Sequence, residues 1–279
     1  MEAEDTRTVA APCTPRPAFA GLPDGPQAAF ARTVGRAVSR ALGARLAGVY
    51  VTGSLVLGDY VDGASDIDML VVVNEALDDL GKRLAAAAVL RLADDCPARG
   101  LELVVYSRAR LHEIERSWWH EENGLPGVLF DLDVNAGPKM PLSVALSQGA
   151  RARHWYVLDV SIAREHAVAL SGPAAALLPQ VPRPLESSAL DDALAWYAAR
   201  SPRDPSSVLT ACRAWRRLAD GEWSSKRQAA LWALRRAPAR GALITAALRR
   251  DEARLPMPSA AAVVDFLWDV RGKLVLAAA

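Results

Sequence analysis

Apolar residues recur along this chain in two patterns, as short runs typical of strands and at the spacing of helices. The place where the strand pattern stops divides the chain into two regions. Short apolar runs predict strands at 46–52, 67–73 and 101–106, the second of them buried on both faces. Helical spacing is found at 27–42 and 77–93. The order helix, strand, strand, helix, strand predicts an α/β domain that has a mixed sheet with flanking helices.

The last third of the chain carries helical spacing with almost no β signal. Amphipathic helices are predicted there at 188–200, 206–219, 224–236, 239–250 and 259–277. Several consecutive helices with apolar faces and short connections bury those faces against one another. We therefore expect an all-α helical bundle in this region.

The segment between these regions carries weaker signals. A fourth strand is predicted at 128–135, and a helix is predicted from Val157 to Leu170, ended by the Gly-Pro pair that follows. Four prolines between 173 and 186 indicate a linker. The resulting division is listed here: a flexible tail at 1–25, the α/β domain at 26–172, the linker at 173–186 and the helical domain at 187–279.

Composition limits the cellular locations and the binding partners that are expected for this chain. The 33 basic and 32 acidic residues leave a net charge of +1, which argues against a nucleic-acid partner bound through bulk positive charge. Three widely spaced cysteines predict neither a disulfide framework nor a structural zinc site. The acidic N-terminus is unlike a secretory signal, and no apolar run is long enough to span a bilayer. We expect a cytoplasmic monomer without a membrane partner.

Two carboxylates stand at the head of the strand at 67–73. Because successive side chains of a strand point to opposite faces, Asp66 and Asp68 share one face while Ile67 points into the core. Burying such a pair without a cation or another partner costs on the order of several kcal/mol. The pair suits a hard divalent cation such as Mg²⁺, whose shell a triphosphate completes. A solvated surface pair is the alternative interpretation.

Residues around this pair extend the candidate site. Gly53 lets the backbone approach a phosphate, and the hydroxyls of Ser54 and Ser65 are suited to contact phosphate oxygens. Glu102 is the single charged residue of the next predicted strand, and it joins the same face if the two strands are neighbours. A third carboxylate there accepts the proton of an acceptor hydroxyl, as the general base for in-line attack on the α-phosphorus. An edge-strand carboxylate facing water is the alternative.

The segment from Gly53 to Asp68, GSLVLGDYVDGASDID, resembles the signature of the nucleotidyltransferase superfamily, in which Gly-Ser and a loop precede Asp-x-Asp at a strand start. Two further segments narrow the resemblance. AREHAVALSGP (163–173) and SVLTACRAWRRLADGEWSSKRQAALWAL (207–234) resemble aminoglycoside adenylyltransferases of the 3''/9 type, which act on streptomycin and spectinomycin. Those enzymes join an N-terminal nucleotidyltransferase domain to a C-terminal helical domain, and the resemblance covers roughly residues 30 to 275.

The resemblance implies roles for individual residues. Asp66 and Asp68 match the metal-binding aspartates, and Glu102 matches the catalytic base. Ser54 and Ser65 match serines that contact the triphosphate.

Two basic residues of the helical region complete the implied nucleotide site. Lys226 matches a lysine that reaches the triphosphate from the helical domain, and Arg213 matches another nucleotide-contacting side chain. A cation supplied across an interdomain cleft stabilises the departing pyrophosphate.

The sequence departs from these enzymes where they bind the drug. They have a tryptophan in the stretch that corresponds to 135–140, where this chain has Asn-Ala-Gly-Pro-Lys-Met. Of their acidic residues before the helix at 206–219, only Asp204 remains, flanked by two arginines. Asp131 and Asp133 are further candidates for contacting the acceptor. Four tryptophans are candidates for lining its pocket: Trp118, Trp119, Trp155 and Trp196.

Together these features predict an adenylyltransferase that moves AMP from ATP to a hydroxyl of an aminoglycoside-like antibiotic and releases pyrophosphate, giving antibiotic resistance. Mg²⁺ is the expected cofactor and ATP the expected co-substrate. Two alternatives stay open. One is the same chemistry on a different small-molecule or macromolecular acceptor, and the other is a non-catalytic nucleotide sensor.

Overall fold

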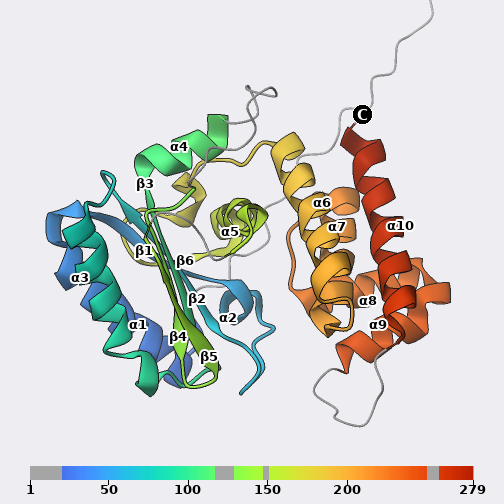
Figure 1. Ribbon diagram of the computed structural model, residues 1–279, viewed down its shortest axis with the longest axis horizontal. Helices are drawn as coiled ribbons and strands as arrows, with labels where there is room; N and C mark the ends of the chain where they lie inside the picture. The colour runs from blue at the N-terminus through green and yellow to red at the C-terminus, as the bar shows by residue number, and fades with distance from the viewer. Residues whose placement is uncertain (1–20, 117–128, 147–150, 250–257, 279) are drawn as a thin grey trace, which may run out of the picture.

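The computed structural model describes residues 21–116, 129–146, 151–249 and 258–278. A sheet covered by helices forms one half of the molecule, and a group of helices forms the other (Figure 1). The helix α5, Arg153–His166, lies between them (Figure 1). The predicted fold class, an α/β domain with a mixed sheet followed by an all-α region, is confirmed.

Six strands of the described residues form one sheet in the order β5-β4-β3-β2-β1-β6. Only β2 and β3 pair in parallel among these strands; the other neighbours are antiparallel. The strands are β1 (Leu46–Thr52), β2 (Ile67–Val73), β3 (Leu101–Ser107), β4 (Leu132–Gly137), β5 (Met140–Ala145) and β6 (Val168–Ser171).

Helices cover both faces of this sheet. Two lie together on one face: α1, Pro26–Leu42, and α3, Asp79–Leu90 (Figure 1). The other face carries α5 and the short helix α2, Gly53–Leu57. The helix α4, Arg108–Arg116, follows directly after β3.

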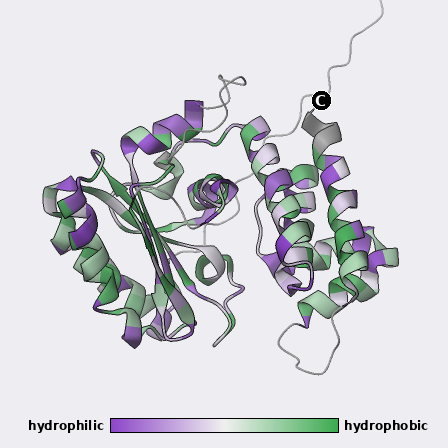
Figure 2. Cartoon of the chain, viewed as in Figure 1, coloured by the Kyte–Doolittle hydropathy of each residue, from purple (hydrophilic) through white to green (hydrophobic). Residues whose placement is uncertain are grey.

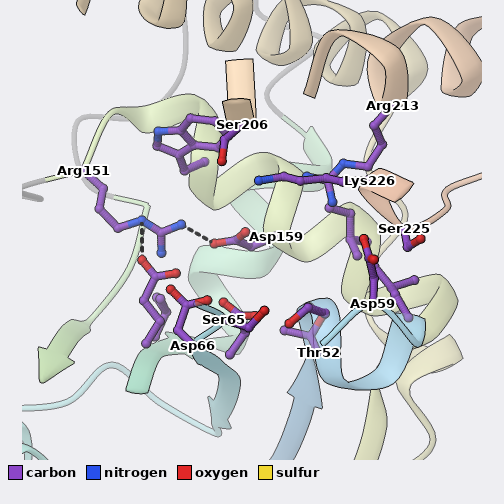
Figure 3. A pocket seen from close by; sticks show the side chains of 18 of the residues that line it. Thr52, Asp59, Ser65, Asp66, Arg151, Asp159, Ser206, Arg213, Ser225 and Lys226 are labelled. Atoms are coloured by element: carbon purple, nitrogen blue, oxygen red, sulfur yellow. Dashed lines mark hydrogen bonds and ion pairs between the residues drawn. The ribbon is translucent and has the colours of Figure 1, made fainter. Parts of the chain in front are cut away.

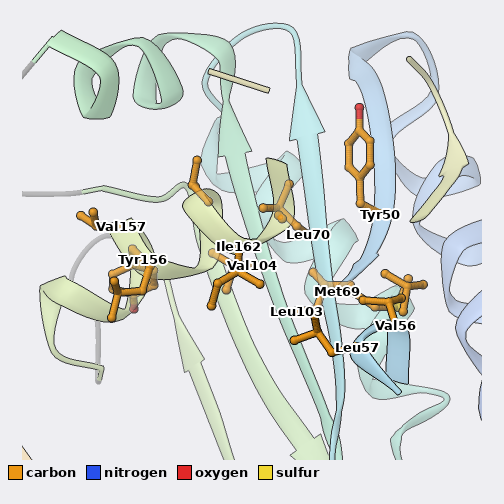
Figure 4. Close-up of a cluster of buried hydrophobic side chains, with 14 of the residues drawn as sticks. Tyr50, Val56, Leu57, Met69, Leu70, Leu103, Val104, Tyr156, Val157 and Ile162 are labelled. Carbon is orange, nitrogen blue, oxygen red and sulfur yellow. The ribbon is translucent and has the colours of Figure 1, made fainter. Parts of the chain in front are cut away.

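The core reflects the alternation expected of strands. Leu70 of β2 and Val104 of β3 lie on the face that meets α5, where Tyr156 and Ile162 belong to the same buried cluster (Figure 4). The central strands are largely hydrophobic, and hydrophilic residues gather on the helices (Figure 2). This packing holds α5 on the face of the sheet that Asp68 and Glu102 also share, because each of them stands two residues before Leu70 or Val104 in its strand.

The second half contains the five helices expected from the periodicity. They are α6 (Arg183–Arg200), α7 (Pro205–Asp220), α8 (Lys226–Arg236), α9 (Gly241–Leu248) and α10 (Ala260–Ala278). Short 3-10 segments lie at η1 (Gly43–Arg45), η2 (Ala93–Asp95), η4 (Ala175–Leu177) and η5 (Pro238–Arg240). None of the described helices has both the length and the apolar character needed to cross a membrane.

A buried polar network attaches this helical half to α5. The Arg217 guanidinium donates to both oxygens of Glu186, at 2.6 and 3.0 Å, and pairs with Glu165 of α5 at 2.7 Å. Trp223 Nε1 donates to Ser161 Oγ of α5 at 2.9 Å, and the Ser161 hydroxyl donates to Glu186. Every member of the network has a partner, so the two halves are joined by polar contacts as well as by apolar packing.

The structure differs from the sequence-based prediction in the middle of the chain. The helix predicted from Val157 to Leu170 ends at His166, and residues from Val168 onward form β6. This strand pairs with the outer edge of β1, whose backbone groups otherwise lack partners in the sheet. The predicted fourth strand is β4, whereas β5 was not anticipated. The range 173–186, predicted as a linker, contains η4 and the first turn of α6.

Candidate active site

A cleft of about 590 Å³ lies between the sheet and the helical half, and residues of both line it (Figure 3). Its walls come from β1, α2, β2, β3 and α5 on one side, and from α6, α7 and α8 on the other. Eleven of the residues singled out in the sequence line it: Gly53, Ser54, Ser65, Asp66, Asp68, Glu102, Trp155, Trp196, Asp204, Arg213 and Lys226. One cavity thus holds residues from widely separated parts of the chain.

Three carboxylates meet at the sheet side of the cleft. Asp68 and Glu102 are register partners in the parallel pair β2–β3, so the predicted adjacency of these strands is confirmed. One oxygen from each of Asp66, Asp68 and Glu102 lies within 4.8 Å of the others. Burial raises the pKa of Glu102 to about 7, although Arg151 opposes the shift. Burial, and then repulsion from the other two carboxylates, raises the pKa of Asp68. Such a cluster favours a bound cation.

Gly53 makes room for this cluster. It has φ +69°, a backbone conformation that glycine adopts readily. A Cβ at this position would overlap the Asp68 carboxylate. The hydroxyls of its neighbours Thr52 and Ser54 are buried in the cleft wall, and neither has a hydrogen-bond partner within the described residues. The turn therefore offers buried hydroxyls beside the carboxylates without crowding them.

Two further contacts hold the loops that carry the carboxylates. Arg99, just before β3, pairs with Asp66, and both side chains line the cleft. The Ser65 hydroxyl accepts a hydrogen bond from Val61 N at 3.0 Å, which supports the loop before Asp66. Ser65 therefore lines the cleft and also stabilises the turn at 61–65.

Arg151 and Asp159 were missed in the sequence. Arg151 Nη2 contacts Asp159 Oδ2 at 2.8 Å, and its Nε lies 3.6 Å from Glu102 Oε1 (Figure 3). The guanidinium also lies over the Tyr156 ring, 5.3 Å from its centre. One sequence feature could have identified Asp159, which is the lone acidic residue in the apolar stretch 155–163. The residues around Arg151 in the sequence do not indicate its partners.

The helical side supplies positive charge. Arg213 of α7 is half-buried, and its removal from water lowers its pKa. Its guanidinium lies 5.7 Å from the centre of the Trp223 ring. Lys226 is the first residue of α8 and lines the cleft. Next to it, Arg227 N donates to Asp59 Oδ2 at 3.0 Å, so the start of α8 is tied to the segment after α2. The helical wall of the cleft therefore carries positive side chains opposite the carboxylate cluster.

Two family models match the chain. A nucleotidyltransferase domain model matches residues 32–121, and the C-terminal domain of aminoglycoside adenylyltransferases matches residues 176–254. The chain belongs to the aminoglycoside nucleotidyltransferases. It is an adenylyltransferase by the same matches, which cover the carboxylate cluster in the first model and both basic residues of the facing wall in the second.

A solved structure has the same fold as this nucleotidyltransferase. It is spectinomycin adenyltransferase AAD(9) from Enterococcus faecialis, crystallised with ATP and spectinomycin. The similarity has a TM-score of 0.61 at 18% sequence identity, and it covers 88% of this chain and 98% of the other. A search of curated proteins finds no significant match.

Two of the acidic residues predicted to contact an acceptor have structural roles in this nucleotidyltransferase. Asp131 is 3% exposed and accepts a hydrogen bond from Ser107 N at 2.6 Å. Asp133 is 1% exposed and accepts from the Tyr156 hydroxyl at 2.7 Å and from Asn135. Neither is among the described residues that line the cleft. The prediction for this pair is corrected: Asp131 holds the start of β4 to the end of β3, and Asp133 holds β4 to α5.

Of the four tryptophans predicted to line the acceptor pocket, two line the cleft and two lie outside the described residues. Trp155 and Trp196 line the cleft, together with Tyr197. Their rings meet edge to face, with centres 6.0 Å apart for the two tryptophans and 5.8 Å for Trp155 and Tyr197. We call these three side chains the aromatic wall. Trp118 and Trp119 lie outside the described residues.

Proposed function

We propose that this protein transfers AMP from ATP to a hydroxyl of an aminoglycoside-like antibiotic, with Mg²⁺ as cofactor and pyrophosphate as the second product. The observation that carries this proposal is the cluster of Asp66, Asp68 and Glu102 in a cleft whose opposite wall carries Arg213 and Lys226. Carboxylates on one side and cations on the other match the two ends of a metal-bound triphosphate.

The carboxylates fit Mg²⁺ in chemistry and in number. The ion prefers oxygen ligands and is commonly held by one or two carboxylates together with substrate phosphates. Asp66 and Asp68 would hold the ion, since their carboxylate oxygens lie within 4.8 Å of each other. Gly53 leaves the space that the Asp68 carboxylate needs. When bound, the ion neutralises charge on the phosphates.

Glu102 is suited to the role of general base. It lies beside Asp68, and burial holds its pKa near 7, close to the optimum for accepting a proton at neutral pH. Glu102 takes the proton of the acceptor hydroxyl as that oxygen forms a bond to the α-phosphorus. The bond from the α-phosphorus to the bridging oxygen breaks, and pyrophosphate leaves. The proton on Glu102 is then released to solvent.

Five residues are proposed to hold the nucleotide: Gly53, Ser54, Ser65, Arg213 and Lys226. Because its buried hydroxyl has no partner among the described residues, Ser54 is well placed to donate to a phosphate oxygen. Lys226 begins a helix, whose dipole also favours an anion at this end. Arg213 and Lys226 together stabilise the charge of the leaving pyrophosphate.

Family membership and the AAD(9) fold support an aminoglycoside-like acceptor, and Asp204 and the aromatic wall line the part of the cleft left for it. Since ATP is the co-substrate and one chain carries every proposed residue, we propose a cytoplasmic monomer. The pairing of Arg151 with Asp159 favours one alternative, an acceptor of lower positive charge.

The proposal is tested by measuring pyrophosphate release from ATP and Mg²⁺ with a panel of acceptors. Release with streptomycin or spectinomycin, and mass-spectrometric detection of the adenylylated drug, is the expected result. Release only with uncharged hydroxyl compounds would support the alternative acceptor. Tight ATP binding without release for any acceptor would contradict an enzymatic role and indicate a nucleotide sensor.

A further inference from the structure

Arg151 stands where the cleft passes from the carboxylate cluster to the aromatic wall. Its guanidinium touches Glu102 on β3 and Asp159 on α5, at 3.6 and 2.8 Å. The side chain is only 16% exposed, and its guanidinium lies over the Tyr156 ring. Tyr156 in turn donates to the buried Asp133 at 2.7 Å. A chain of contacts therefore holds Arg151 in this position.

Around the aromatic wall, four charged side chains of the cleft balance one another. Arg151 and Arg200 supply two positive side chains, and Asp159 and Asp204 supply two negative ones. Asp159 is paired with Arg151, and Asp204 Oδ1 accepts from Ser206 N at 2.8 Å as the N-cap of α7. The Arg200 guanidinium lies over Trp196 of the aromatic wall, 5.9 Å from the ring centre.

A site for a polycation requires carboxylates in excess of cations, because each ammonium or guanidinium group that leaves water needs a partner. Here Asp159, the carboxylate that shares Arg151 with the base, already has its cation. A guanidinium-bearing acceptor would meet Arg151 and Arg200 instead. The aromatic wall offers what a hydroxylated ring compound needs, namely flat apolar surfaces for the ring.

We propose that Arg151 is the residue that determines acceptor specificity: by neutralising Asp159 beside Glu102, it restricts the site to hydroxylated ring compounds of low positive charge and excludes polycationic ones. This inference rests on the proposed adenylyl transfer. Replacing Arg151 exposes the Asp159 carboxylate to the acceptor and creates a binding partner for an added cationic group.

The test compares two drugs that differ in charge, spectinomycin and the guanidinium-bearing streptomycin. The quantity measured is the ratio of their kcat/KM values, because a general loss of activity through a displaced Glu102 affects both drugs equally. Arg151→Gln is compared with wild type and with Arg83→Gln, a matched control on α3 whose side chain is 72% exposed and outside the cleft. Drug affinities are also measured by calorimetry in the presence of Mg²⁺ and α,β-methylene-ATP.

Wild type is expected to prefer spectinomycin. Arg151→Gln should move the ratio toward streptomycin by about tenfold, the size of one added charge-assisted contact, and Arg83→Gln should leave it unchanged. Turnover of both drugs with the same ratio in Arg151→Gln as in wild type would overturn this inference and leave the proposed function standing. Absence of both turnover and binding for both drugs would overturn the proposed acceptor class and the inference with it.

Discussion

Asp68 and Glu102 lie directly opposite each other on the parallel strands β2 and β3, and their carboxylates share one face of the sheet with Asp66. Parallel in-register pairing brings side chains from two strands to the same end of the sheet. The pairing places a proposed metal ligand, Asp68, next to the proposed base, Glu102. Substitution of one residue at a time tests the two roles separately.

Replacing Glu102 with Gln is expected to lower kcat by about 10²- to 10⁴-fold, because the amide cannot accept the acceptor proton. Affinity for ATP and Mg²⁺ should change by less than about threefold, since Asp66 and Asp68 remain. Pyrophosphate release and calorimetry measure the two quantities. Glu113→Gln, an exposed change on α4, is the control. Retention of more than about a tenth of wild-type kcat would rule out the base assignment.

Binding of Mg²⁺ and ATP is expected to release protons near neutral pH. Burial raises the pKa of Glu102 to about 7 and also raises that of Asp68, so the metal-free cluster carries protons that the cation displaces. Affinity should therefore rise between about pH 6 and about pH 7.5 and then level off. Calorimetry in buffers of different ionisation enthalpy counts the protons. Binding without release would contradict this.

The same pKa shifts predict that the folding stability of the metal-free protein falls with rising pH, whereas its affinity for Mg²⁺ and ATP rises. A carboxyl whose folded-state pKa is raised binds its proton more tightly in the folded protein than in the unfolded chain. Its contribution to stability is present below the unfolded value of 4.5 and is lost as the pH rises through about 7. The Tm of the metal-free protein should fall over that interval, and Glu102→Gln should reduce the fall.

Gly53→Ala is expected to abolish transfer. The added methyl group would overlap the Asp68 carboxylate, and the left-handed backbone at φ +69° costs about 1–2 kcal/mol for a residue with a Cβ. Gly272→Ala is the control, because that position in α10 has open space around it and a helix favours Ala. Normal Mg²⁺-dependent ATP binding by Gly53→Ala, measured by calorimetry, would show that the carboxylate is not displaced.

Lys226→Met is expected to weaken ATP binding by about tenfold or more, because a cation that contacts the triphosphate contributes at least one charge-assisted hydrogen bond. Affinity for the acceptor should stay within about twofold. Equilibrium dialysis with labelled ATP measures the first quantity. Arg235→Met removes an exposed positive charge from the same helix and should have little effect on ATP affinity. Equal ATP affinity in the two variants would exclude a nucleotide contact for Lys226.

The buried pair of Arg217 and Glu186 is expected to dominate the stability of the junction between α5 and the helical half. Arg217→Met leaves the buried Glu186 without its cation and should cost about 3–5 kcal/mol of unfolding free energy. Removal of both charges, in Arg217→Met with Glu186→Leu, should cost less. The exposed pair Arg45–Asp78 gives the comparison: Arg45→Met should change the stability measured in urea titrations far less than Arg217→Met.

Much of the middle of the chain was decided by edge pairing that a local pattern does not encode. The sequence at Val168–Ser171 continues the apolar spacing of α5, but the open edge of β1 pairs with it and makes it a strand. The carboxylates of Asp131 and Asp133 look available in the sequence, but the folded protein buries both, and they accept hydrogen bonds from the end of β3 and from Tyr156 of α5.

The sequence by itself determined the α/β class, the helical half, and Asp66, Asp68 and Glu102 as a candidate cluster. These follow from periodicity and from the two-residue alternation of strands, which are properties of neighbouring residues. Only the tertiary structure decided that Arg151 joins Glu102 to Asp159. That contact depends on how α5 crosses the sheet, and the position of a helix over a sheet is set by the packing of the whole core rather than by any short stretch of sequence.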